Sequence, residues 1–438
     1  MAATAAAALA LAATVAVVSL AAPNGVAAAA KAPPRTTYFQ DVKPILDGRC
    51  TGCHVDGGIA PFSLTTYGDA RASRNALAQA VRMRAMPPWH AKRGVRRYLH
   101  DPSLTNGQIS AIVRWARNGA PRGDAARPGK PLRPIPTGLS RVDVRLPMPE
   151  AYTPKHGAGH DDYRCFPLDW TPGATTYVTG VDIAPGARAV VHHIIVYLAP
   201  PASASTVAQW DAADPEPGYR CYGGPSADGR QGLGINFLAG WAPGAGSSDF
   251  PAGTGQRVVP GSRLVMQVHY NVTSPAPRPD RSTVRLSLAP SVERRAVYLP
   301  VVDLGWVLSP QTFRLPARRR GIVHTFTGDP TPVVRYLGGF DPARGFTMHS
   351  AALHMHRLGR TARLVVQRAS GRRELLLEIP RWDFDWQRDY RFAKPVGFAP
   401  GDRLSLRCTH DNTTRRLVTW GEDSSDEMCI GFVYVAER

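Results

Sequence analysis

Short runs rich in β-branched and aromatic residues recur from about residue 145 to the end of the chain, and they limit the fold more than any other feature. Glycine, proline, aspartate and asparagine separate these runs. Such punctuated runs are typical of strands in antiparallel sandwiches or jelly rolls, and they exclude a helical bundle. The clearest predicted strands are Thr176–Ile183, Ala189–Leu198, Arg263–Val272, Thr283–Leu288, Thr361–Arg368, Glu374–Ile379 and Ile430–Val435. We therefore expect a mainly β fold.

The β region has a break near Pro290–Leu299, which predicts two lobes, 145–290 and 291–438. Before it, residues 38–122 have a helical pattern, and a proline-rich linker, 123–144, joins the two regions. A chain of 438 residues is long enough for several such domains. The predicted helices are Asp41–Leu46, Ala70–Arg84 and Thr105–Asn118, the last with a start signal at Ser103-Leu-Thr-Asn.

Residues 1–30 differ from the rest, because they are almost purely Ala, Leu and Val and end in small residues. This composition predicts a secretory signal, although no Lys or Arg precedes the apolar run, so a retained membrane anchor is the alternative. Export predicts a periplasmic or secreted protein in an oxidising compartment, where disulfides persist. Four cysteines fall as one pair in each predicted lobe and predict the disulfides Cys165–Cys221 and Cys408–Cys429.

The chain is strongly basic, with 53 Lys and Arg against 34 Asp and Glu, a formal net charge of +19. The arginines are scattered through strand-like segments and form no nucleic-acid-binding motif, so we exclude nucleic acid as a partner. A basic surface on an exported protein instead suits solubility, an acidic redox partner protein or an anionic membrane.

The motif Cys50-Thr-Gly-Cys53-His54 is that of c-type haem attachment. Two thiols at this spacing can form thioethers to the porphyrin, and His54 then lies under the iron. Met86, before a Pro-Pro bend, is the preferred sixth ligand, since a thioether suits electron transfer. The alternatives are a CxxC disulfide beside an incidental histidine, a Met86 that only packs on the ring, or one of three other ligands: Met83, His90 or His100.

Ligand-type residues also occur in the β region. His354 and His356 lie two apart in a strand, so they share a face and can hold one metal, while Met355 points into a core. The other candidates are His192, His193, His269 and Met428. The adjacent pair His192-His193 can bind one metal only where its strand twists or ends. A thioether beside histidines favours copper, because zinc disfavours that sulfur. A three-histidine site could bind zinc or copper, and the sequence alone does not choose between them.

These pieces, in this order, resemble the copper type II ascorbate-dependent monooxygenases, the peptidylglycine- and dopamine β-hydroxylating enzymes. The resemblance covers roughly 145–438 and rests on HH in a β run, QVHY, HMHRLG and the ending DEMC. It implies two jelly-roll β-sandwich lobes with one copper each. An electron-relay copper would be held by His192, His193 and His269. An oxygen-binding, catalytic copper would be held by His354, His356 and Met428.

The resemblance implies hydroxylation of a C–H bond of a small organic substrate with dioxygen, with ascorbate as a conceivable external reductant. The chain departs from amidating members at Ala352, where they carry an arginine that grips a carboxylate, and at Ile430 and Phe432, where they carry Asn and Tyr. Peptide amidation is therefore disfavoured, and the pocket is expected to be apolar.

The N-terminal segment, with PILDGRCTGCHVDGGIAPFSL and MPPW, resembles the cytochrome modules that bacteria fuse to exported enzymes, and its haem could feed the relay copper. The alternative functions are a non-catalytic haem and copper electron-transfer or copper-binding protein, and a metal-free carbohydrate- or protein-binding sandwich. Gln267 is a candidate for an electron-path role or for simple packing. We expect four further residues to be structural or at the surface: Tyr270, His324, His349 and His410.

Overall fold

The structure is a computed structural model that describes residues 35–56, 58, 60–136, 138–155, 161–227, 235–242, 248–272 and 277–438. The expected signal segment, 1–30, lies outside the described residues. Residues Thr36–Arg438 form one compact unit. In the described part of the chain, no helix is both long and apolar enough to cross a bilayer.

The N-terminal segment is helical and has its own apolar core, which includes Leu46, Ile112 and Trp115. Its last helix begins where the sequence predicts, because Thr105 and Gln108 form a reciprocal capping box at 3.2 and 2.9 Å. The elements are the π-helix η1 (Tyr38–Val42) and the helices α1 (Lys43–Arg49), α2 (Tyr67–Ala72), α3 (Arg74–Arg82) and α4 (Asn106–Arg117).

The predicted helix Ala70–Arg84 is wrong in its extent, since it is two shorter helices, α2 and α3. Thr66 caps the first of them with Asp69, so α2 begins before Ala70. Ser73 then leaves the helical conformation, with a ψ of 4°, and separates the two. A side-chain cap and one non-helical residue thus override the continuous apolar pattern.

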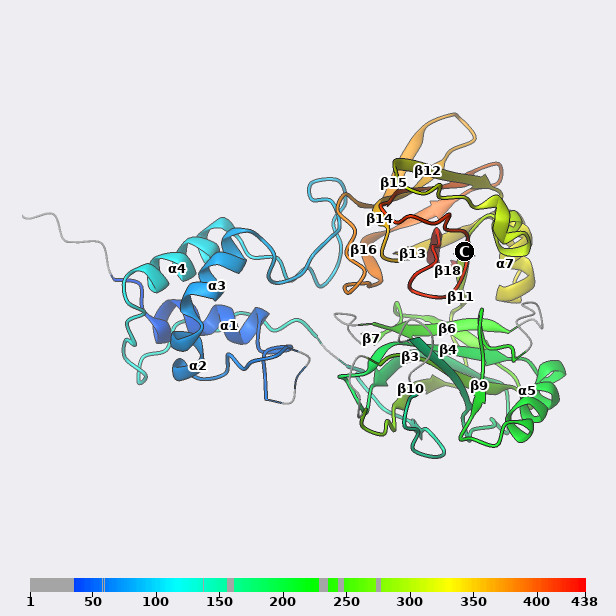
Figure 1. The fold of residues 1–438 in the computed structure, drawn as a ribbon, viewed down its shortest axis with the longest axis horizontal. Coiled ribbons are helices and arrows are strands. Elements are labelled where there is room, and N and C mark those ends of the chain that lie inside the picture. Colours follow the sequence, from blue (N-terminus) through cyan, green and yellow to red (C-terminus); the bar gives the residue numbers. More distant parts are fainter. Residues whose placement is uncertain are drawn as a thin grey trace, which may run out of the picture. The chain divides into compact units, whose positions relative to one another are not determined.

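The N-terminal lobe packs two sheets around one core (Figure 1). One sheet has the order β5-β2-β9-β4-β6, and the other contains β1, β10, β3, β7 and β8. The strands are β1 (Val144–Pro147), β2 (Asp161–Pro167), β3 (Thr176–Ala184), β4 (Val191–Ala199), β5 (Tyr219–Arg220), β6 (Asn236–Trp241), β7 (Ser248–Asp249), β8 (Thr254–Val258), β9 (Arg263–Asn271) and β10 (Thr283–Ala289), with helix α5 (Pro201–Ala213).

The C-terminal lobe repeats this layered arrangement around a second core. One sheet has the order β12-β17-β14-β15, and the facing strands β11-β18-β13-β16 continue the N-terminal lobe's sheet through β8. The strands are β11 (Arg294–Val301), β12 (Arg319–Gly328), β13 (Phe346–His354), β14 (Gly359–Gln367), β15 (Arg373–Ile379), β16 (Tyr390–Phe398), β17 (Arg403–Asn412) and β18 (Ile430–Glu437). The helices are α6 (Leu304–Leu308), η3 (Pro310–Thr312), α7 (Thr331–Gly338) and η4 (Pro342–Arg344). The prediction of a mainly β protein is confirmed.

An irregular stretch between α3 and α4, residues Trp89–Leu99, which we call the arm, lies against the C-terminal lobe. It covers the edge strand β16, because the Leu99 N–H donates to the Arg391 carbonyl at 2.8 Å and the Ala393 N–H to the Arg97 carbonyl at 3.0 Å. Ala91 is buried in the core of that lobe. The arm therefore removes an open sheet edge.

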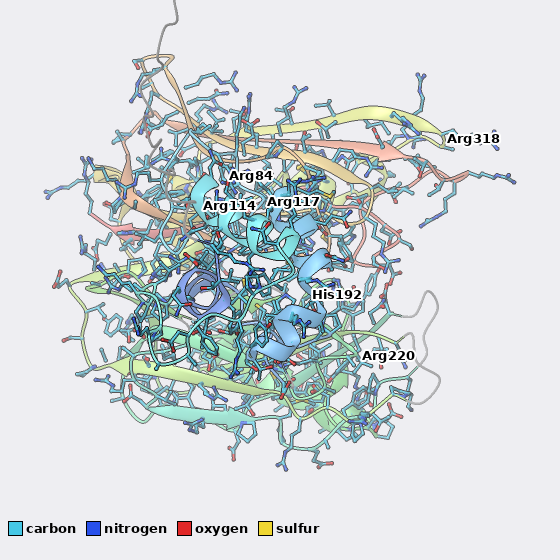
Figure 2. All side chains as sticks on the ribbon, turned by 90° about the vertical axis from the view of Figure 1, so that its left-hand side faces the viewer. Arg84, Arg114, Arg117, His192, Arg220 and Arg318 are labelled. Atoms are coloured by element: carbon cyan, nitrogen blue, oxygen red, sulfur yellow. A yellow bond between two sulfur atoms is a disulfide. The ribbon has the colours of Figure 1, made fainter. Side chains whose placement is uncertain are left out.

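Arginines lie on helices, strands and turns alike, which agrees with the scatter expected from the sequence. The labelled examples in Figure 2 are Arg84, Arg114, Arg117, Arg220 and Arg318.

Candidate metal centres

Three imidazoles converge in the N-terminal lobe. His193 and His269 lie opposite each other on the paired strands β4 and β9, and His192 precedes His193. The Nδ1 atom of His193 lies 3.2 Å from Nδ1 of His192 and 3.2 Å from Nδ1 of His269. Imidazole nitrogens that share a tetrahedral metal at about 2.0 Å stand roughly 3.3 Å apart, so the cluster fits one metal ion.

The adjacent pair can face one site because strand β4 is irregular at this point. Its register with β9 shifts between Val191 and His193, so that His192 is the extra residue of a bulge. A bulge redirects a side chain that strict alternation would place on the opposite face. The sequence analysis required the strand to twist or end if His192 and His193 were to bind one metal, and this bulge meets that requirement.

A carboxylate fixes the orientation of His269. Its Nε2–H donates to Asp161 at 3.0 Å, which leaves Nδ1 for a metal, the carboxylate–histidine–metal arrangement of many protein sites. Burial by itself raises the pKa of Asp161, but hydrogen bonds from His269, Ser424 and Asn271 outweigh burial and hold the pKa below its usual value. Burial lowers the pKa of His192 to about 3, so that this imidazole is neutral and able to bind a metal at neutral pH.

The second cluster lies at the end of strand β13 in the C-terminal lobe. The rings of His354 and His356 are 5.1 Å apart, and Met355 between them is fully buried, which confirms that it points into the core. His354 donates from Nδ1 to Gln387 at 2.7 Å, and His356 from Nδ1 to the Asp426 carbonyl at 3.3 Å. Each ring thus keeps Nε2 for a metal. Burial lowers the pKa of His356 to about 3.

Met428 is joined to this pair through the buried carboxylate of Glu427. One oxygen, Oε2, accepts hydrogen bonds from the backbone N–H groups of both His356 and Met428, each at 3.1 Å. The Cys408–Cys429 disulfide anchors the next residue, and the Met428 side chain is buried. Both predicted disulfides are present, which confirms the pairing.

Phe384, in the loop between β15 and β16, lies between the two clusters. Its ring stacks on His192 with centroids 4.6 Å apart and lies 6.0 Å from His356. Gln387, three residues on, donates to the Phe384 carbonyl at 2.9 Å and also holds His354. One loop of the C-terminal lobe therefore contacts both clusters.

The haem motif has features that fit a porphyrin. Cys50 and Cys53 are unpaired thiols, whereas the other four cysteines form disulfides. His54 donates from Nδ1 to the Phe62 carbonyl at 3.1 Å, which fixes the tautomer and leaves Nε2 as a possible iron ligand. Met86 is half-buried and Met83 is 65% exposed. The haem assignment, including Met86 as sixth ligand, stays a prediction.

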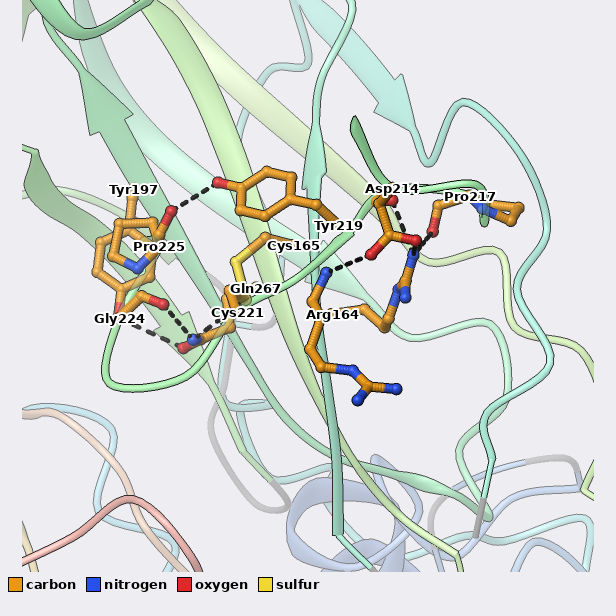
Figure 3. Close-up of a disulfide and its surroundings, with 12 residues drawn as sticks. Arg164, Cys165, Tyr197, Asp214, Pro217, Tyr219, Cys221, Gly224, Pro225 and Gln267 are labelled. Carbon is orange, nitrogen blue, oxygen red and sulfur yellow. Dashed lines mark hydrogen bonds and ion pairs between the residues drawn. A yellow bond between two sulfur atoms is a disulfide. The ribbon is translucent and has the colours of Figure 1, made fainter. Parts of the chain in front are cut away.

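The residues expected to be structural lie in packed surroundings. Gln267 donates to the Gly224 carbonyl at 2.8 Å and lies beside the Cys165–Cys221 disulfide (Figure 3). The Tyr197 hydroxyl donates a hydrogen bond to the side-chain oxygen of Gln267. Tyr270 donates to Asp280, and His410 is fully buried beside Glu427. His324 stacks on Phe313 in the core of the C-terminal lobe, and His349 is buried.

Sequence reasoning did not single out Asp161, Phe384, Gln387, Ser424 or Glu427 as site residues. Asp161 and Gln387 come from segments with no motif, and only the fold brings them to the histidines. Glu427 and Ser424 had a weak signal, since they lie within the segment that ends in the quoted motif DEMC. A buried acid next to a ligand methionine could have been suspected of ordering the backbone there.

Residues 340–438 match the family model for the C-terminal domain of the copper type II ascorbate-dependent monooxygenases. The matched residues include His354, His356 and Met428, so the match covers the second cluster of the C-terminal lobe. Residues 340–438 are therefore similar to the C-terminal domain of the copper type II ascorbate-dependent monooxygenase family.

Three curated relatives agree with this family. DBH-like monooxygenase protein 2 of Mus musculus is 25% identical and the match covers 57% of this chain and 38% of that protein. Putative DBH-like monooxygenase protein 2 of Homo sapiens is 26% identical, with 56% and 46% covered. DBH-like monooxygenase protein 1 of Gallus gallus is 26% identical, with 57% and 39% covered. The chain thus spans less than half the length of these relatives.

Proposed function

We propose that this protein hydroxylates a C–H bond of a small organic substrate. One atom of dioxygen enters the C–H bond and the other leaves as water, with two electrons and two protons consumed. The observation that carries the proposal is the pairing of two clusters. In one, His193 Nδ1 lies 3.2 Å from Nδ1 of both His192 and His269, and in the other a histidine pair is joined through Glu427 to the buried Met428. A non-catalytic electron-transfer protein would not need the second cluster.

The two clusters would divide the work. His192, His193 and His269 would hold an electron-relay copper, and His354, His356 and Met428 would hold the copper at which dioxygen reacts. Copper supplies one-electron chemistry, and a soft thioether ligand favours its reduced form. Asp161 and Gln387 keep the protons of His269 and His354 on the nitrogens that face away from the metal.

The substrate surface next to His354 would be apolar. On the paired strands β13 and β18, His354 lies opposite Ile430, and Ala352 lies opposite Phe432. Phe237 of the N-terminal lobe stacks on Phe432 with centroids 4.9 Å apart. An apolar surface gives a carboxylate no partner and would penalise its desolvation. We therefore expect a substrate that is uncharged near the reacting carbon.

Electrons would come either from an external reductant such as ascorbate or from a haem bound at Cys50, Cys53 and His54. The unpaired thiols and the oriented His54 favour the haem. The protein would be periplasmic or secreted, which agrees with its two disulfides.

Metal analysis and oxygen uptake test this proposal. Wild-type protein from copper-replete cells should bind two copper ions and one haem, seen by elemental analysis and the pyridine haemochrome spectrum. Met428→Ala should lose substrate-dependent oxygen uptake while it keeps its haem. Met348→Leu, a volume-conserving change at a buried methionine on the same strand as His354, is the matched control and should keep the activity. Protein that binds no copper would contradict the proposal.

A further inference from the structure

Asp161, the first residue of strand β2, connects the two lobes at the three-histidine cluster. Its Oδ1 accepts from His269 Nε2–H and from Asn271 Nδ2–H, both at 3.0 Å. Its Oδ2 accepts from the N–H and the Oγ–H of Ser424 at 3.2 and 2.7 Å. Ser424 belongs to the C-terminal lobe. The same buried carboxylate thus orients a ligand-type histidine and holds the other lobe.

Tyr163 makes a second connection of the same kind. It lies two residues after Asp161, on the same face of β2, and its ring stacks on His269 with centroids 4.2 Å apart and planes 6° apart. Its hydroxyl donates to the Glu422 carbonyl of the C-terminal lobe at 2.8 Å. Both residues therefore contact His269 on one side and the segment 421–428 on the other.

That segment leads directly to the second cluster. The Asp426 carbonyl accepts from His356 Nδ1–H, and the Glu427 carboxylate accepts from the backbone of His356 and Met428. Ser424 is four residues before Met428. A displacement of the segment at Ser424 would therefore move groups that position His356 and Met428.

We propose that Asp161, Tyr163 and Ser424 form an interlobe contact that positions both clusters, so that copper binding in one lobe depends on residues of the other. The inference rests on the proposed function for its copper ligands. None of the three residues is a proposed ligand, and each acts through the residues it touches. The two metal centres thus become organised together when the lobes associate.

The copper test uses variants that remove one contact across the lobes. Ser424→Ala, in the C-terminal lobe, should weaken copper binding at the His192, His193 and His269 cluster about tenfold, the lower end of what outer-shell partners contribute. Tyr163→Phe keeps the stacking ring and should weaken binding at the His354, His356 and Met428 cluster. Each affinity is measured by copper titration in a background that lacks the other cluster.

The matched control is Asp162→Asn, one residue away on the opposite face of β2. Asp162 accepts from the Tyr152 hydroxyl and the Lys155 N–H, both in the N-terminal lobe. The Asp162→Asn variant should keep copper affinity at both clusters within twofold of wild type. If Ser424→Ala and Tyr163→Phe each altered only the cluster in their own lobe, the interlobe contact would have no positioning role.

A measurement without metal separates this inference from the proposed function. In copper-free protein, amide hydrogen exchange in residues 421–428 should accelerate in Tyr163→Phe and remain at the wild-type rate in Asp162→Asn. Unchanged exchange in Tyr163→Phe would overturn the interlobe contact. Failure to bind copper, with accelerated exchange, would instead refute the proposed function and leave the contact standing.

Discussion

Three ligand-type histidines each have one ring nitrogen held by an oxygen of the protein. Asp161 holds His269, Gln387 holds His354 and the Asp426 carbonyl holds His356. These oxygens determine which nitrogen carries the proton, and so which one can face a metal. The sequence alone points to His and Met as candidate ligands, because these residue types carry the donor atoms, and their role as ligands stays a prediction. The orienting oxygens could not be predicted, because they come from remote segments.

Gln387 offers the sharpest test of such an orienting oxygen. Gln387→Leu keeps a similar size but removes the acceptor for His354, so copper affinity at the His354, His356 and Met428 cluster should fall about tenfold to a hundredfold. Gln387→Glu keeps an acceptor and should restore the affinity. The measurement is copper titration of both variants. Equal affinities in Gln387→Leu and wild type would show that the 2.7 Å bond does not orient the ring.

His349 should make the fold sensitive to acid. Burial, with the charges of Arg294 and Arg391, lowers its pKa to about 4 from an ordinary 6.5, and its Nε2 has no hydrogen-bond partner among the described residues. The unfolded chain binds this proton more readily, so stability is lost as pH falls from about 6.5 towards 4. His349→Gln should reduce that loss by about 2 kcal/mol, measured by urea unfolding at pH 7 and pH 4.5. Identical pH dependence in the variant and wild type would contradict this.

At the scale of elements, the regular alternation of apolar residues predicted which face of a strand a residue occupies. Local irregularities in the strands and helices could not be predicted in this way. The alternation around His354 and Met355 correctly placed one residue at the cluster and the other in the core. The bulge at His192 depends on pairing with β9, which the sequence of β4 alone does not specify. Helix α5 was missed, because its Ala- and Ser-rich sequence has no apolar stripe and lies between strands.

The disulfide Cys408–Cys429 ties strand β17 to the start of β18, immediately after Met428. Its sequence separation is 21, so loss of the cross-link should cost about 3 kcal/mol of unfolding free energy. The double variant Cys408→Ala, Cys429→Ala should show that loss in denaturant unfolding and should also weaken copper binding at Met428.

The second disulfide provides the comparison. Cys165–Cys221 closes a longer stretch, with a separation of 56, and its removal should cost about 4 kcal/mol. It lies beside Gln267 in the N-terminal lobe (Figure 3), and neither cysteine neighbours Met428 in the chain, so copper binding at the His354, His356 and Met428 cluster should persist. Equal loss of copper at that cluster in both double variants would mean that neither disulfide has a local effect.

At the scale of the whole molecule, the arm is the main feature that the sequence did not predict. The basic stretch Trp89–Leu99 has no strand-like alternation, and its partner strand β16 lies almost three hundred residues further along the chain. Composition and periodicity predict a helical N-terminal segment followed by two β lobes. They do not predict the contact that joins the segment to the C-terminal lobe.

Tyr98 should be the principal anchor of the arm. Its ring contacts Trp89, Tyr390 and Phe392, and its hydroxyl donates to the Leu376 carbonyl at 2.8 Å. Tyr98→Ala should lower the unfolding free energy by about 2 kcal/mol and speed proteolysis of the arm, whereas Tyr98→Phe should cost only about 1 kcal/mol. Chemical denaturation and timed trypsin digestion test this. Wild-type digestion in Tyr98→Ala would mean that the arm is held elsewhere.

Because the arm packs on the C-terminal lobe, the end of the helical segment in the sequence is not a position at which the protein can be cut into separate folded parts. A shortened protein that starts after residue 122 would lose Ala91 from a hydrophobic interior and leave β16 open to pairing with other molecules. Such a fragment should precipitate even though its proposed copper ligands are intact. Any attempt to produce the β lobes alone would have to retain the arm or replace it.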